Sequence, residues 1–122
     1  MINHLILIAL GGSIGAILRY LFTLAIPINN LPLATLSVNV IGSLLIGIAF
    51  YFLQKTADQD FLKYFIIIGV FGSFTTFSTF SLDIFRLIEQ KQIILSLIYL
   101  ISSVSLSILA VFAGYFLSKN VF

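Results

Sequence analysis

Four long apolar segments make up almost all of this chain, and short polar connectors separate them. Hydropathy places the segments at residues 3–26, 31–54, 61–87 and 92–117. Each segment reaches the roughly 20 mostly apolar residues that a helix needs to cross a lipid bilayer. The sequence therefore predicts an all-α, multi-pass membrane protein with one domain, residues 1–122, of four transmembrane helices.

The composition supports the membrane class and excludes several others. Hydrophobic residues make up 61% of the chain, charged residues 8%, and the mean hydropathy is +1.21. A formal net charge of +2 is too small to indicate a nucleic-acid partner. Because the chain has no cysteine, it can form neither a disulfide framework nor a thiolate metal site.

Basic residues are divided evenly between the two sides that four spans create. The side with both termini and the 54–61 loop has Lys55, Lys63 and Lys119; the side with the 27–30 and 88–92 turns has Arg19, Arg86 and Lys91. Because the Lys and Arg difference sets orientation, this tie predicts insertion in both orientations. The simplest use of both orientations is an antiparallel dimer. Such a dimer corresponds to the two inverted repeats that many transporters carry within one chain. The alternative is that one loop dominates for reasons that the count misses.

The third segment contains a polar stretch at residues 69–81, GVFGSFTTFSTFS, with two glycines, three serines and three threonines. Glycine weakens a helix, and Ser and Thr side chains can bond the backbone groups that a break frees. The stretch predicts a third helix that is broken near Gly72 to Thr76. Non-helical backbone at membrane depth is tolerated only where it is buried in protein or lines a cavity, so this stretch is the candidate site.

Polar and aromatic side chains at helical spacing indicate which residues could line such a cavity. Phe77 and Phe80 are three residues apart, so both rings project from one face, although ordinary packing would use the same spacing. Asn39 offers two N–H donors and one acceptor oxygen, which suit either contact between helices or an anion. Stripes at four-residue steps continue the pattern in the second and fourth spans: Thr35, Asn39, Ser43 and Gly47, and Tyr99, Ser103 and Ser107.

Charged residues inside the spans are few. Arg19 lies late in the first span and either reaches the membrane surface or stands at the mouth of an anion pathway. Asp83 is the one carboxylate candidate within a span, so a proton-coupled cation pump would have few groups to carry protons. Hydrogen-bond donors therefore outnumber negative charges, which favours an anion. Free carbonyl groups at the break would instead hold a cation.

Three motifs, GGSIGAILRY at 11–20, TLSVNVIGSLLIG at 35–47 and GVFGSFTTFSTFS at 69–81, resemble the signatures of the small bacterial fluoride channels, the Fluc (CrcB) family. The resemblance covers essentially the whole chain. It implies a channel in the cytoplasmic membrane, and not an enzyme, that exports fluoride passively and lowers its toxicity. It also implies an antiparallel dual-topology dimer with two pores and a central structural sodium ion.

The same resemblance implies roles for individual residues. Phe77, Phe80 and Asn39 match pore positions, and Arg19 matches the arginine of the vestibule. Gly72 and Thr75 match the positions whose backbone carbonyls hold sodium. The polar track of the family is matched by Thr35, Ser78, Ser81, Tyr99, Ser103 and Ser107. Two positions depart from the family: Asp83 where a Glu is usual, and Ser73 where a second Gly is frequent.

Two other readings of the sequence remain. Small dual-topology multidrug exporters have a similar length and layout but need a membrane-embedded Glu in the first span, and this first span has no acidic residue. The chain could also be one subunit of a heterodimer with a paralogous chain, although every pore position is filled here. The sequence does not distinguish a homodimer from a heterodimer.

Overall fold

The computed structural model describes residues 1–26 and 31–122, and within these ranges all regular structure is helical. The elements are α1 (Ile2–Ala25), α2 (Leu33–Leu53), η1 (Phe61–Phe71), α3 (Gly72–Phe74), α4 (Phe77–Glu89) and α5 (Ile93–Val121). Four stretches are long and apolar enough to span a bilayer, and η1, α3 and α4 together form the third. The prediction of an all-α protein with four spans is confirmed. The turn at residues 27–30, which was used to assign basic residues to the two sides of the membrane, lies outside the described residues.

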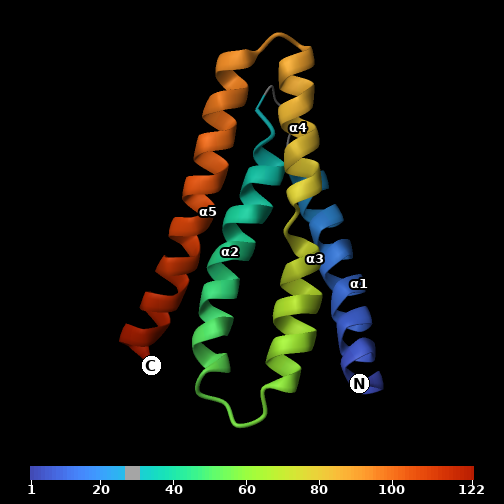
Figure 1. Ribbon diagram of the computed structural model, residues 1–122, viewed down its shortest axis with the longest axis vertical. Helices are drawn as coiled ribbons and strands as arrows, with labels where there is room; N and C mark the ends of the chain where they lie inside the picture. The colour runs from blue at the N-terminus through green and yellow to red at the C-terminus, as the bar shows by residue number, and fades with distance from the viewer. Residues whose placement is uncertain (27–30) are drawn as a thin grey trace.

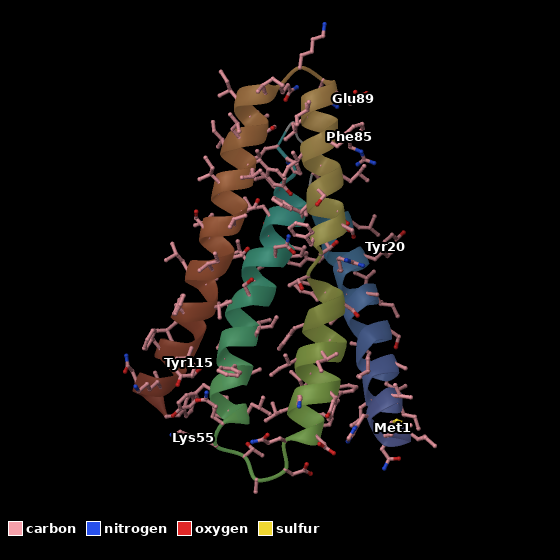
Figure 2. The ribbon with its side chains drawn as sticks, in the orientation of Figure 1. Met1, Tyr20, Lys55, Phe85, Glu89 and Tyr115 are labelled. Atoms are coloured by element: carbon pink, nitrogen blue, oxygen red, sulfur yellow. The ribbon has the colours of Figure 1, made fainter. Side chains whose placement is uncertain are left out.

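The four spans lie side by side along the long axis of the molecule (Figure 1). The most extensive contacts join α2 to α5 and α1 to η1. Both termini lie at the same end as the loop between α2 and η1, while the turn between α4 and α5 lies at the opposite end (Figure 1). Figure 2 accordingly shows Met1, Lys55 and Tyr115 near one end and Glu89 near the other.

Glycines permit the closest helix contacts. A methyl group added at Gly47 of α2 or at Gly114 of α5 would overlap a carbonyl oxygen of the facing helix. Methyl groups at Gly11 and Gly15 of α1 would likewise overlap carbonyl oxygens of η1. Small residues at these positions let the backbones approach, which is the usual packing device of helices in lipid.

Large apolar side chains cover the outer faces of the helices. Ile94 is 77% exposed and Leu109 62% exposed, and similar residues occur along all four spans. A contiguous apolar surface of this kind is stable against lipid tails, whereas in water it would associate. Together with the length of the four apolar stretches, it makes the chain a multi-pass membrane protein.

The third span is interrupted at two threonines. Thr75 (φ −76°, ψ 157°) and Thr76 (φ −151°, ψ 121°) are extended, and α4 begins directly after them. The break lies within the predicted range, but the glycine is not where it occurs, because Gly72 is helical (φ −62°, ψ −32°). The helix before the break, η1, is a wide π-helix, a form that is frequent near functional sites.

Candidate functional site

Asn39, in the middle of α2, holds the break in place. Its Nδ2 donates to the Thr76 carbonyl oxygen over 3.0 Å, and its Oδ1 accepts from the Thr76 backbone N–H over 2.8 Å. An extended residue between two helices has no helical partner for either group, and a buried unpaired polar group costs about 1–3 kcal/mol. The amide therefore satisfies both groups at once, and its second N–H remains for another acceptor.

Thr76 also caps the helix that follows the break. Its hydroxyl oxygen accepts from the Thr79 backbone N–H over 3.1 Å, as the first residue before a helix commonly does. The same hydroxyl donates to Thr79 Oγ1 over 3.1 Å and contacts Ser78 Oγ over 3.2 Å. Thr76 is 7% exposed, so this cap is buried inside the span.

The bonds made by the Thr76 and Thr79 backbone N–H groups leave the carbonyl groups of Gly72 and Thr75 without their helical partners. In a continuous helix the Thr76 N–H would donate to Gly72 and the Thr79 N–H to Thr75. Here the first donates to Asn39 and the second to the Thr76 hydroxyl. Freed carbonyl oxygens fit a monovalent cation such as sodium. The described residues contain no group of three or more His, Cys, Asp or Glu that could hold a metal.

Arg19 lies beside the break. Its Nη1 donates to the Thr75 carbonyl oxygen over 3.5 Å, and a carbonyl oxygen has a second lone pair for another partner. Arg19 also lines a pocket of about 290 Å³. The lining residues of this pocket are Ala16, Arg19, Tyr20, Thr23, Thr35, Val38, Thr76 and Thr79. Tyr20, labelled in Figure 2, lies near the height at which α3 and α4 meet. Arg19 thus lies among threonine hydroxyls beside the break, and its vestibule role stays a prediction.

A second pocket, the break pocket, shares Thr76 with the first. Its volume is about 300 Å³, and its lining is Asn39, Ser43, Ile46, Thr75, Thr76, Phe77, Phe80, Ser103, Val104, Ser107 and Ile108. Five predicted pore residues from three spans therefore meet here: Asn39, Phe77, Phe80, Ser103 and Ser107.

The two phenylalanines of the break pocket have different surroundings. The ring centroids of Phe77 and Phe80 are 5.5 Å apart, with the planes tilted by 47°. Phe80 is 6% exposed and also packs against Tyr99, whereas Phe77 is 77% exposed. Packing within the chain explains why an aromatic residue stands at position 80. It does not explain the residue at position 77, because the Phe77 ring is largely exposed.

Ser103 of α5 is a buried donor without a partner. The residue is 3% exposed, and its hydroxyl forms no hydrogen bond within the part of the chain that the structure describes. Buried polar atoms are nearly always hydrogen-bonded, so an orphan on a pocket wall indicates a ligand or water. Ser103 lines the break pocket, although its hydroxyl oxygen itself is buried.

Thr35 and Tyr99 face Asp83 and not the break pocket. The Thr35 hydroxyl donates to Asp83 Oδ2 over 2.6 Å, and the Tyr99 hydroxyl donates to the same oxygen over 3.3 Å. Arg86 Nη1 lies 3.9 Å from the other oxygen. Asp83 belongs to none of the predicted sites; a carboxylate inside an apolar span is the sequence signal for this cluster.

Ser78 and Ser81, the remaining members of the predicted track, lie at the start of α4. Ser78 contacts the Thr76 hydroxyl, and the Ser81 hydroxyl donates to the Phe77 carbonyl oxygen over 2.9 Å. Bonds of this last kind are common for serine in membrane helices and need no ligand. Neither residue lines the break pocket.

Comparison with known families places the chain. The model of the family described as "CrcB-like protein, Camphor Resistance (CrcB)" matches residues 6–115. The chain belongs to the CrcB family. The matched range includes the break, the Asn39–Thr76 hydrogen bonds and all lining residues of both pockets. The site is therefore built from residues that lie inside the CrcB match.

Curated relatives in the CrcB family are similar over nearly their full length. A protein named "Fluoride-specific ion channel FluC" from Rhizobium meliloti strain 1021 is 44% identical, with 96% of this chain and 97% of the relative covered. One of the same name from Agrobacterium fabrum strain C58 is 41% identical over 100% of both chains. "Fluoride-specific ion channel FluC 3" from Methanosarcina barkeri is 39% identical, with 90% and 86% covered. These names describe ion channels and not enzymes.

Proposed function

We propose that this chain is a fluoride-selective ion channel that exports fluoride passively across the cytoplasmic membrane and so lowers its toxicity. The observation that carries the proposal is the break pocket, where hydrogen-bond donors and aromatic rings from three spans converge at a helix break. The names of the curated relatives support the choice of fluoride.

The chemistry of the break pocket suits a small anion. Fluoride holds its water tightly, so donors must replace most of the hydration. Asn39 has one N–H left after its bonds to Thr76, and Ser103 and Ser107 add hydroxyl groups. The positive edges of the Phe77 and Phe80 rings add a weaker attraction. Among the described residues no carboxylate lines this pocket, and Arg19 lines the neighbouring pocket, which shares Thr76 with it, where it can attract anions from water.

The proposal extends to an antiparallel homodimer with two pores and a structural sodium ion. Only Gly11 and Gly15 of α1 are buried, which leaves most of that helix for lipid or a second copy. The freed carbonyls of Gly72 and Thr75 cannot by themselves complete the oxygen shell of a cation. Two inverted copies would bring four such oxygens together, and sodium would supply the positive charge that holds them.

Ion flux from liposomes tests the channel proposal. Liposomes that contain only this purified chain should release fluoride much faster than chloride under the same gradient. Equal release of both anions, or none of either, would contradict the proposal. If the chain alone is silent but conducts when mixed with a paralogous chain, the assembly is a heterodimer and not the proposed homodimer.

The sodium proposal has its own test. Prolonged replacement of sodium on both sides by a large organic cation should reduce fluoride flux and loosen the dimer, because the carbonyl groups would lose their counter-charge. Readdition of sodium should restore both properties. Unchanged flux and dimerisation without sodium would remove the site from the proposal while the channel stands.

A further inference from the structure

The last turns of α2 and α5 form an aromatic cluster at the end of the molecule where both termini lie. The Tyr51 ring is 4% exposed and meets the Tyr115 ring edge to face, with the centroids 5.9 Å apart. The Tyr115 hydroxyl donates to Gln54 Oε1 over 3.2 Å. Figure 2 shows Tyr115 and Lys55 near this end. Because tyrosines at the ends of membrane spans lie at the level of the lipid headgroups, the cluster marks where headgroups meet the protein.

Two lysines stand beside this cluster without a carboxylate partner. Lys55 Nζ lies 4.7 Å from the centroid of the buried Tyr51 ring, and this contact holds the ammonium group in place. Lys119 is in the last turn of α5, four residues after Tyr115 and therefore on the same side of the helix. Neither lysine forms a salt bridge within the described residues. Since an ammonium group has three N–H donors, both lysines can donate to a phosphate from outside the chain.

Aromatic rings continue from Lys119 toward the middle of the membrane. Phe116 and Phe112 precede Lys119 by three and seven residues, so the three side chains share one face of α5. The two rings stack with their centroids 6.4 Å apart and their planes 15° apart, and the side chains are 50% and 57% exposed. A cation followed by lipid-facing rings matches the two parts of an anionic phospholipid, its headgroup and its acyl chain.

We propose that Lys55 and Lys119 bind the phosphate of an anionic phospholipid whose acyl chain lies along Phe112 and Phe116. The charges are complementary, because lysines near the membrane surface attract anionic lipids. The packed tyrosines join the two helix ends, so the lysines are presented together and not as separate surface charges. None of these residues lines either pocket, and the site does not depend on which ion the chain conducts.

Lipid binding by the purified chain tests this proposal. Dioctanoyl phosphatidylglycerol, added to the protein in a non-ionic detergent, should raise the thermal unfolding temperature in a saturable way, because a ligand of the folded state stabilises it. Native mass spectrometry should detect the bound lipid. Dioctanoyl phosphatidylcholine and inorganic phosphate should have little effect. Equal stabilisation by phosphatidylcholine would show that the negative charge is not recognised, and equal stabilisation by inorganic phosphate would assign the lysines to a free anion. Either result would overturn the proposal.

Substitution of the two lysines locates the site. Lys55→Gln with Lys119→Gln should weaken phosphatidylglycerol binding at least about tenfold, since each lysine adds to the attraction of an anionic headgroup. Both side chains are exposed, so this variant should unfold at the wild-type temperature when no lipid is added. Lys55→Arg with Lys119→Arg keeps both charges and should retain binding.

A matched control separates this site from general electrostatic attraction. Lys63→Gln with Lys91→Gln removes the same charge, but Lys63 lies over a different ring, that of Tyr64, and Lys91 follows α4 at the opposite end. This control should bind phosphatidylglycerol like the wild-type chain. A similar loss in both Gln variants, or no loss in either, would overturn the proposal. So would stabilisation by an acidic peptide but not by the lipid, because the surface would then be a docking site for protein.

Discussion

The side-chain amide of Asn39 and the backbone of Thr76 exchange two hydrogen bonds, 3.0 and 2.8 Å long, across the interrupted third span. One side chain thus replaces the backbone partners that a continuous helix would have provided. The same residue also lines the break pocket. Asn39 therefore has a structural role, holding the break, and a proposed role as a donor to the anion. Substitutions must be chosen to distinguish these two roles.

Asn39→Asp should abolish most fluoride flux. Aspartate keeps an acceptor for the Thr76 N–H but has no donor for the Thr76 carbonyl and, when ionised, repels an anion. We expect at least about a tenfold loss of liposome efflux, with the protein still folded in size-exclusion chromatography. Asn120→Asp, the same change on an exposed residue at the end of α5, is the control. Normal efflux in Asn39→Asp would move the pathway away from the break pocket.

Phe80→Ile should reduce flux while the fold remains. The substitution conserves much of the apolar volume, so its effect on stability should stay below about 1.5 kcal/mol. Loss of the ring removes the positive edge that would attract the anion, so fluoride efflux should fall. Phe112→Ile, a change on a side chain that is 57% exposed, should leave flux unaffected. An equal effect of both variants would mean that the Phe80 ring contributes packing alone.

Gly47→Ala should destabilise the chain, whereas Gly72→Ala should be tolerated. A methyl group at Gly47 overlaps the Val111 carbonyl oxygen, and forced overpacking costs about 1–3 kcal/mol. A methyl group at Gly72 meets nothing closer than the Ile67 carbonyl oxygen at 3.5 Å, and the Gly72 carbonyl is kept. Thermal unfolding in detergent measures the difference. Equal stability of the two variants would contradict the close contact between α2 and α5.

Asp83→Ala should lower stability more than Asp83→Asn. Alanine leaves the buried Thr35 and Tyr99 hydroxyls without their acceptor, at about 1–3 kcal/mol for each. Asparagine keeps one acceptor oxygen for them. Chemical or thermal unfolding is the measurement, and Asp58→Ala, on an exposed residue of the 54–60 loop, is the control. The cluster has no structural role if Asp83→Ala unfolds at the wild-type temperature.

Tagged C-termini should be found on both sides of the membrane. The predicted tie in basic residues underlies this expectation. Glu89→Lys with Gln90→Lys adds positive charge at one end and should retain that end in the cytoplasm, and Asp58→Lys with Gln59→Lys should do the opposite. Cysteine accessibility or reporter fusions at the C-terminus measure the distribution. A single orientation of the wild-type chain would remove the antiparallel dimer from the proposal.

Much of the site could be read from residue spacing. The break was expected between Gly72 and Thr76, and the structure has it at Thr75 and Thr76. Asn39, Phe77, Phe80, Ser103 and Ser107, whose pore roles the family resemblance implies, share the break pocket. Periodicity within each helix predicted which side chains share a face, and the short connectors made neighbours of these spans.

Other features of the site could not be predicted in this way. The resemblance implies pore roles for Thr35 and Tyr99; their bonds to Asp83 were not predicted, because spacing along a helix does not say which neighbour a hydroxyl will meet. The break was attributed to glycine, yet Gly72 is helical and the threonines carry the extended backbone.

By itself, the sequence determined that this chain spans a membrane four times and where its third span weakens, because transfer to lipid and helix propensity depend on local composition. Only the tertiary structure decided which backbone groups at the break are satisfied and which are free. That choice depends on how the second span packs against the third, which brings the Asn39 amide to the Thr76 backbone. The pairing of a polar atom in lipid is a property of its neighbours in space, and neighbours in space follow from packing.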